Sequence, residues 1–518
     1  MTAVIHRHFY HMRFAADSHF VLQSDILKPS NFRKKVVKLT KAEFDFQRSL
    51  IEQIEVLNAT VAAQAKTIEQ LSQTIAELRE QINKNSKNSS KPPSSDGLKK
   101  PAPKSLRESS GKKAGGQDGH LGSNLSKFAA VTEPVLHMPA ACAGCPHYET
   151  CKGNACITER RQVVDINVEV KVTEHQALKV AHCMLHGDCR IGTFPEDVKA
   201  AVQYGNNLQA LVVTMNTMGA VSIKRTHEIL SGVFGIPIAT GSISNMVKRC
   251  ANQLTEVVDM IRQHMIAAKL GHFDETGTRV DKKLWWVHDA SNEEFTYLAL
   301  SSKRGSAGID ECGVLPAFSG IAMHDCWAPY WNYTKANHAV CCAHLLRELT
   351  GIIENHPDQQ WASGFMKLLL KMKKTKEKLI TKGKECMSTY YNNKFSLQYQ
   401  ELIEQGKAAN PLPETTKKKC GRKKKGKILA LIERLEQHKA SVCLFANDFL
   451  VPFDNNQAER DIRMVKVKTK VSGCFRTEDG ARDYLKIMSY VGTAHKHGFN
   501  AYEAIKNAFS GTPEFIFE

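Results

Sequence analysis

The sequence lacks the long apolar runs that mark membrane and exported proteins. No stretch approaches the roughly 20 apolar residues of a membrane-spanning helix, although 42% of the 518 residues are hydrophobic. The first residues, MTAVIHRHFYHMRFAADSHFVLQ, lack the continuous apolar block of a signal peptide. Without an export signal, the 15 cysteines fit reduced thiols and metal ligands better than disulfides, so we expect a cytoplasmic protein.

Acidic residues are in the minority. There are 53 Asp and Glu residues against 71 Lys and Arg, which gives a net charge of +18 and a pI near 9.2. This charge favours a polyanionic partner, with nucleic acid first and an anionic membrane second. The length allows about three or four domains.

The N-terminal region predicts a coiled coil after an unassigned leader over residues 1–43. Over residues 44–83, apolar side chains recur in alternating steps of four and three. Apart from Gln64, β-branched residues stand at a and Leu at d, which favours parallel dimers. The alternative is one amphipathic helix packed on its own domain. The seam consists of Leu50, Ile54, Leu57, Val61, Gln64, Ile68, Leu71, Ile75, Leu78 and Ile82.

Residues 84–128 predict a flexible basic linker. The segment is rich in Ser, Pro, Gly and Lys, as in NSKNSSKPPSSDGLKKPAPK, and has few large apolar side chains. It cannot bury enough surface to offset the entropy lost on ordering. Its lysines can still contact phosphates without a fixed fold.

Residues 129–195 hold six cysteines whose spacing resembles a zinc-finger-like module. CAGC is a C-x-x-C pair, and HCMLHGDC supplies further ligands after a strand-like stretch over residues 160–183. Two ligand clusters separated by a strand hairpin are typical of a zinc ribbon, which binds one structural Zn²⁺. The alternative is a group of unliganded thiols. The preferred ligands are Cys142, Cys145, Cys183 and Cys189, with His186 or Cys151 as substitutes.

Residues 196–265 have mostly helical patterning, with a break near residues 232–237 that Gly and Pro mark. Such a helix pair fits a helix-turn-helix that reads DNA. It fits a plain packing hairpin at least as well.

Residues 266–345 predict the first part of an α/β catalytic core. Residues 270–302 fit three consecutive strands, separated near 280–283 and 291–292. Asp274 lies on the first strand. Its neighbour Glu275 is expected on the opposite face, because side chains alternate along a strand.

Two further acids complete a constellation with Asp274. Asp325 ends a buried-type strand, and Glu459 lies in the basic stretch DNNQAERDIRMVKVKTK. Each aspartate alone would also fit a turn cap, but two aspartates and a glutamate can together bind two divalent cations for phosphoryl transfer. Mg²⁺, or Mn²⁺, suits such oxygen ligands. The basic residues expected to bind DNA are Arg460, Arg463, Lys466, Lys468, Lys470, Arg476, Lys423 and Lys424.

The long interval between Asp325 and Glu459 has helical periodicity. Residues 346–440 therefore predict a helical insertion with a flexible basic loop near residues 415–427. Residues 441–518 would supply the second part of the core and the C-terminal helices.

Several strings resemble motifs of the insertion sequence 66 family of bacterial transposases, of the DDE class. They are NSKNSSKPPSSD, HFDETGTRV, HDCWAPYW, HAVCCAHLLREL, DNNQAERDIR and GTAHKHGFNAYEAI, and the resemblance covers about residues 45–518 in the family's order. It implies a ribonuclease-H-like core in which Asp274, Asp325 and Glu459 match the DDE positions. It also favours a place near the active site for His344 and Arg347, for which simple packing is the alternative.

The resemblance also implies partners and a reaction. It implies binding to the terminal inverted repeats of a mobile element and to target DNA, with metal-dependent end cleavage and strand transfer. A homodimer or larger assembly would form through the coiled coil, with accessory proteins from the same element. The protein would be associated with the bacterial nucleoid.

Two alternative functions share some of these features. A zinc-containing, coiled-coil DNA binder that acts as a regulator has the charge and the cysteines, but it has no use for all three acids. A structure-selective nuclease on the same core would cleave DNA without joining it, and the family motifs weigh against it.

Overall fold

The computed structural model describes residues 10–11, 23–24, 40–85, 87–89, 127–166, 168–181, 184–186, 189–411 and 426–517. The chain divides into two compact units, Met1–Asn85 and Ser86–Glu518. Within these described ranges, no helix is both long and apolar enough to cross a membrane. The leader contributes one antiparallel pair, β1 (Tyr10–His11) with β2 (Gln23–Ser24).

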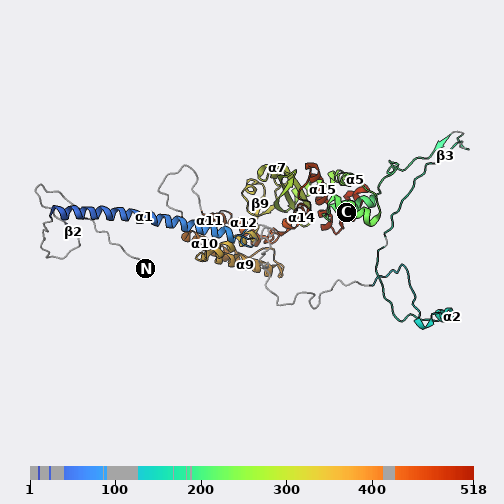
Figure 1. The fold of residues 1–518 in the computed structure, drawn as a ribbon, viewed down its shortest axis with the longest axis horizontal. Helices are drawn as coiled ribbons and strands as arrows, with labels where there is room; N and C mark the ends of the chain where they lie inside the picture. Colours follow the sequence, from blue (N-terminus) through green and yellow to red (C-terminus); the bar gives the residue numbers. More distant parts are fainter. Residues whose placement is uncertain are drawn as a thin grey trace. The chain divides into compact units, whose positions relative to one another are not determined.

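Helix α1 (Lys41–Asn83) confirms the long helix that the heptad pattern predicts (Figure 1). A capping box begins it: the Thr40 hydroxyl accepts from the Glu43 N–H, and the Glu43 carboxylate accepts from the Thr40 N–H at 2.8 Å. The apolar seam stays exposed, with Ile68 at 64% and Leu78 at 51%. An exposed seam of this length favours a partner helix over packing within the unit, and the coiled coil itself stays a prediction.

The first part of the predicted linker is packed. Asn88 and Ser89 are buried, at 7% and 6% exposure, and Asn88 lies against the helix α8 (Cys342–Asn355). The Asn88 amide donates to the Glu354 carboxylate at 2.7 Å. Composition predicted a segment without a fixed position, but one amide bonded to a distant carboxylate is enough to dock it here. Residues 90–126 lie outside the described residues.

The cysteine-rich segment has little regular structure among its described residues. It contains η2 (Ala140–Cys142), α2 (Tyr148–Gly153) and one antiparallel pair, β3 (Lys179–Val180) with β4 (Arg190–Ile191). The strand-like stretch over residues 160–183 therefore yields only β3 among its described residues, contrary to expectation. Its alternating side chains, such as Val163 at 94% exposure, meet no surface that could pair or bury a longer strand.

Four helices precede the sheet: α3 (Asn206–Asn216), α4 (Ile223–Phe234), α5 (Thr240–Gln253) and α6 (Thr255–Ala267). Gly235, with φ of 63°, ends α4 in the left-handed region that favours glycine. Val213, Leu230 and Ile243 are fully buried in one core that also contains Ile487 of a C-terminal helix. The packing role of these helices is therefore clear, and DNA reading by α4 and α5 stays a prediction.

The sheet confirms the three predicted strands and their breaks. Its strands are β5 (Leu270–Val280), β6 (Lys283–Ser291), β7 (Thr296–Ser301), β8 (Ile321–His324) and β9 (Asn337–Val340). They lie in the order β7-β6-β5-β8-β9; the first three are antiparallel, and β8 and β9 run parallel to β5. Asp281 and Lys282 have φ of 46° and 63°, which fits the tight hairpin turn that sheet twist favours between β5 and β6.

The predicted helical insertion packs around a core of its own. After α8 it contains α9 (Gln360–Ile380), α10 (Thr389–Ala409), α11 (Lys427–Gln437) and α12 (Lys439–Asn447), which lie together in Figure 1. Phe365, Tyr399 and Ile432 are fully buried there, next to residues of β8 and β9. The basic loop with Lys423 and Lys424 lies outside the described residues.

The C-terminal segment returns to the sheet as α13 (Asn456–Asp461), α14 (Arg463–Ser472), α15 (Glu478–Lys496), α16 (Ala501–Phe509) and η4 (Pro513–Phe517). Helix α15 packs along β7, where the Thr493 hydroxyl accepts from the Thr296 N–H at 3.1 Å. At its end, the Lys496 ammonium binds the Asp461 carboxylate at 2.6 Å, with both side chains largely buried. This ion pair fixes α13 against the sheet.

Lys496→Met should lower the free energy of unfolding by about 3–5 kcal/mol, because it leaves the Asp461 carboxylate buried without its cation. Urea unfolding measures the loss. Asp461→Asn combined with Lys496→Met should recover much of it, and Lys486→Met, on the same helix but outside this pair, serves as the control. A loss no larger than that of the control would contradict a structural role for the pair.

Candidate active site

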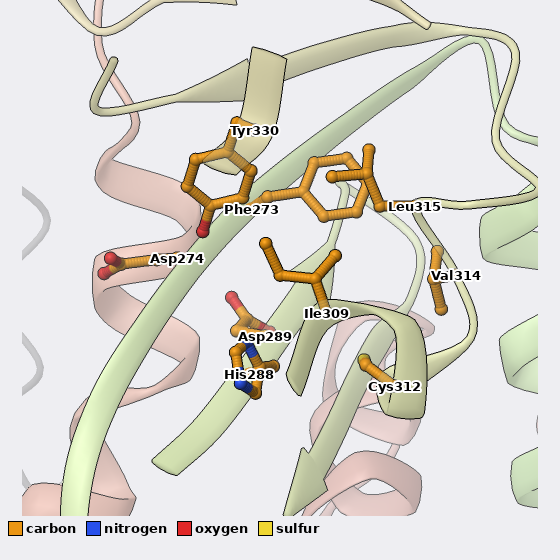
Figure 2. A pocket seen from close by; sticks show the side chains of 9 residues that line it. All are labelled: Phe273, Asp274, His288, Asp289, Ile309, Cys312, Val314, Leu315 and Tyr330. Carbon is orange, nitrogen blue, oxygen red and sulfur yellow. The ribbon is translucent and has the colours of Figure 1, made fainter. Parts of the chain in front are cut away.

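Asp274 is the most perturbed acid at the centre of the site. Its carboxylate accepts from the Glu275 N–H at 2.9 Å and points away from the neighbouring Phe273 ring (Figure 2). Burial raises the pKa of Asp274 to about 7, and the charges of Glu275 and Asp325 add to the rise. Burial is thus the main reason that the charged form of Asp274 is disfavoured, and the two neighbouring acids disfavour it further.

Asp325 lies beside Asp274 because of the strand register. Strand β8 pairs in parallel with β5, His272 opposite Met323, so continuing the register brings Asp325 next to Asp274. The Asp325 carboxylate accepts from the Trp327 N–H at 3.0 Å, and Cys326 between them has φ of 71°. The acid thus caps a strained turn as well as facing the site, so the two interpretations of this aspartate are compatible.

Glu459, on α13, approaches from the other side. Arg347 of α8 donates to its carboxylate at 3.4 Å, and His344 lies 3.9 Å from the same oxygen. The charges of Asp325 and Glu459 both act on the pKa of His344, although burial and Arg347 lower it overall. The Asp325 charge thus acts both on Asp274 and on His344, the residue beside Glu459. Among the described residues, however, no three acids, histidines or cysteines lie close enough to hold a metal ion as they stand.

The side chain of Asn455, the residue before α13, links the helix that carries Glu459 to strand β5, which carries Asp274. Its amide donates to the Phe273 carbonyl at 2.9 Å and accepts from the His272 ring at 2.7 Å. Its backbone N–H donates to the Cys341 sulfur at 3.1 Å, at the start of α8. Asn455 is 2% exposed, so it is a positioning residue and not a DNA contact.

Two hydrogen-bonded histidines, His324 and His338, hold the turn that contains Asp325 and Cys326. The Cys326 N–H donates to Nδ1 of His324 at 3.1 Å, so Nε2 of His324 carries the proton and donates to Nδ1 of His338 at 3.0 Å. His338 in turn donates to the Tyr333 carbonyl at 3.2 Å. Both rings are thereby held neutral in one tautomer, and burial lowers the pKa of His324 well below its usual value.

Sequence reasoning missed a second group at the site. The Glu275 carboxylate accepts from the Tyr330 hydroxyl at 2.6 Å and from Arg304 at 2.8 Å. Arg304 also lies against the rings of Trp286 and Trp327. Burial raises the pKa of Glu275, and the Asp325 charge adds to the rise. The motif HDCWAPYW contains Tyr330, but no sequence pattern around Arg304 indicates that this arginine binds Glu275.

A buried acid, Asp289, stands opposite Asp274 in the β5–β6 register. One of its oxygens accepts from the Ser291 hydroxyl at 3.0 Å, and the other has no hydrogen-bond partner among the described residues. Burial raises its pKa well above the usual value, and Asp461 adds to the rise. It lines a small cavity behind the site, formed by Phe273, Asp274, His288, Asp289, Ile309, Cys312, Val314, Leu315 and Tyr330 (Figure 2).

The predicted basic residues divide into two groups. Arg463, Lys466 and Lys470 are exposed along one face of α14, and Arg460 and Arg476 are exposed nearby. The Lys466 charge acts on Asp274, which places this face beside the acids. Lys468 departs from the prediction, because it is 7% exposed and donates to the Asn216 carbonyl at 2.7 Å. Lys468 faces inward, where its ammonium lies over the Tyr484 ring and reaches the last residue of α3.

The predicted zinc ligands are not gathered in the described part of the segment. Cys142 and Cys145 lie in one turn, where the Cys145 N–H donates to the Cys142 carbonyl at 3.1 Å, and Cys189 is exposed next to β4. Cys183 lies outside the described residues. The zinc site stays a prediction.

Asp274→Asn should stabilise the metal-free protein, and the gain should grow with pH. The Asp274 carboxyl stays protonated up to about pH 7 when folded but ionises near 4 when unfolded, so the cost of burying it increases across this interval and is complete above it. We expect the gain in unfolding free energy to rise by about 2–3 kcal/mol between pH 5 and pH 8, from urea unfolding in EDTA. The exposed control Glu293→Gln should show no such trend, and an equal gain at both pH values would contradict the raised pKa.

Comparisons with known proteins identify a family for this chain. The model of a family described as Transposase IS66 family matches residues 201–483, which is more than half of the chain and includes Asp274, Asp325 and Glu459. The model of a family of unknown function (DUF6444) matches residues 42–126. No curated protein matches the chain. The family match confirms the resemblance of the sequence motifs: the chain belongs to the IS66 family of transposases.

Proposed function

We propose that this protein binds the terminal inverted repeats of an insertion element and cleaves and joins DNA through Asp274, Asp325 and Glu459. The proposal rests on the adjacency of Asp274 and Asp325 on paired strands and on the Asp325 charge acting on His344, which lies beside Glu459. Family membership supports action on DNA as a transposase.

The sheet supports a ribonuclease-H-like core. Three antiparallel strands are followed by two parallel ones, in the order β7-β6-β5-β8-β9, with the first acid on the central strand β5 and the second directly after its parallel neighbour β8. Helices α8 to α12 form an insertion between the second and third acids. The long interval between Asp325 and Glu459 thereby adds a helical lobe without interrupting the sheet.

The acid pair Asp274 and Asp325 fits a divalent cation chemically. Both are hard oxygen donors, and a bound cation would favour the ionised form of Asp274, whose pKa burial and the neighbouring acids raise. Mg²⁺ or Mn²⁺ held by Asp274, Asp325 and Glu459 would activate the attacking oxygen and stabilise the leaving one. Glu459 is bound to Arg347 in the structure, so it would have to exchange this partner to join the other two acids.

The surrounding residues have separate tasks in this proposal. Arg460, Arg463 and Lys466 would hold the phosphates of the strand that is cut, since they are exposed next to the acids. Asn455 keeps Glu459 in place, and Arg347 limits its negative charge until DNA and cation are bound. The element's own 3′-hydroxyl would attack target DNA, so no covalent protein intermediate is needed.

The N-terminal parts would assemble the active complex. Two copies of α1 would pair along the exposed seam, bringing two element ends together. A structural Zn²⁺ at Cys142, Cys145, Cys183 and Cys189 would order the cysteine-rich segment. Accessory proteins of the same element and target DNA complete the proposed partners.

Asp325→Asn and Glu459→Gln should each abolish cleaved and joined products while leaving DNA affinity within a factor of about three, because they remove acids and no phosphate contact. The assay incubates the purified protein with the terminal repeats that flank its gene, in Mg²⁺ or Mn²⁺. Glu293→Gln, an exposed acid distant in sequence from the triad, is the matched control. Products from either acid variant at the control's rate would remove that residue from the catalytic set.

Ile68→Asp with Leu71→Asp should convert a dimer to a monomer, since each puts a charge into the apolar seam. Gln70→Asp adds the same charge outside the seam and should leave the mass unchanged. Light scattering gives the mass, and the assay above reports whether paired ends are still joined. A dimer that survives the seam substitutions would exclude α1 as the dimerisation element.

A further inference from the structure

A three-residue segment, Lys87–Ser89, docks on the helix that contacts the catalytic glutamate. The Asn88 amide donates to Glu354 at 2.7 Å, and Asn88 and Ser89 are among the few polar residues under 9% exposed. Because a buried side-chain amide needs its partners, this contact specifies one position for the segment. We call the part of α8 that contacts this segment the Gly351–Glu354 face.

Gly351 makes this docking possible. A Cβ at this position would lie 2.5 Å from the Asn88 carbonyl oxygen, a distance that atoms in folded proteins do not adopt. The backbone of the docked segment therefore lies directly against the helix backbone. Glycine within a helix costs about 1 kcal/mol relative to alanine, so its presence here indicates that the close approach matters.

The docking site and the active site share one face of α8. His344, Arg347, Gly351 and Glu354 follow one another in steps of three, four and three, which places them on a single stripe of the helix. His344 and Arg347 contact Glu459, and the docked segment begins one turn further on, about 6 Å along the axis. A shift of the segment would therefore act on the helix that holds Glu459.

The docked segment follows the proposed dimerisation helix almost immediately. Helix α1 ends at Asn83, and only residues 84–87 precede Asn88. Sequence composition predicted a freely moving linker from residue 84 onward, which would have separated dimerisation from catalysis. The contact with α8 instead anchors the chain before the long linker begins.

We propose that Asn88 and the Gly351–Glu354 face form an internal docking site that couples the dimerisation helix to the catalytic helix α8. The expected consequence is that pairing of two α1 helices is transmitted through the docked segment to Arg347 and Glu459. This consequence rests on the proposed function. The occupant is this chain's own Asn-Ser segment. Loss of docking should leave both the dimer and the folded catalytic core, but it should impair joining of paired ends.

Limited trypsin digestion of the full chain tests the docking with an internal reference. Lys84 is exposed, whereas Asn88 after Lys87 is buried. In the wild type, the Lys87–Asn88 bond should be cut about tenfold more slowly than the Lys84–Asn85 bond, by mass spectrometry. Equal rates at the two bonds in the wild type would overturn the docking site itself.

Variants on both sides of the contact test its specificity. Asn88→Ala and Gly351→Ala should each raise cleavage at Lys87 about tenfold, through a lost hydrogen bond and a steric clash respectively. Glu354→Gln retains an acceptor and should stay near the wild type. Gly232→Ala, in α4 with open space around it, is the matched glycine control. Unchanged cleavage in both Asn88→Ala and Gly351→Ala would overturn the assigned contacts.

The same variants test the coupling in the end-joining assay. Asn88→Ala changes no residue of the catalytic core, so single-end nicking and the mass of the dimer should stay unchanged. We expect this variant to lower the joining of paired ends about tenfold. Normal joining with a released segment would overturn the coupling. If the wild type itself forms no products, the proposed function fails, and the trypsin experiment still decides the docking site.

Discussion

The buried amide of Asn455 is the contact on which the arrangement of the three acids depends. It joins the β5 backbone at Phe273, the His272 ring and, through its own N–H, the Cys341 sulfur at the start of α8. Glu459 lies one helical turn later. A single residue therefore relates the helix that presents the third acid to the strand that carries the first and to the helix that supplies Arg347. Removing its side chain would leave several buried polar groups unpaired, which is costly at each of them.

The acids are held together against electrostatic repulsion. Burial and neighbouring acids raise the pKa of Asp274 and Glu275, and Asp289 lies behind them with one oxygen unpartnered among the described residues. The surrounding fold must therefore supply stability elsewhere, as the buried pair of Lys496 and Asp461 does at the base of α13. Such concentration of like charge is common at sites that bind cations, where function requires an arrangement that destabilises the empty protein.

Helix α8 contacts both Glu459, the proposed catalytic acid, and Asn88. Its first turns contact Glu459, and its last turns hold Asn88 in the space that Gly351 leaves open. The family match over residues 201–483 covers α8 and the sheet, while the docked segment falls in the separate match over residues 42–126. The contact between Asn88 and Glu354 therefore links the two matched regions of the chain.

The sequence by itself determined the parts of this protein that depend on local pattern. Alternation and turn residues predicted β5, β6 and β7, heptad spacing predicted α1, and the strand pattern placed Asp274 and Asp325 at the positions that the β5–β8 register makes adjacent. Only the tertiary structure decided which side chains meet. Lys468 faces inward and binds Asn216 across 252 positions, Arg304 binds Glu275 across 29, and Asn88 binds Glu354 across 266. Contacts between residues so far apart leave no periodic trace in the sequence, because each depends on how separate elements pack.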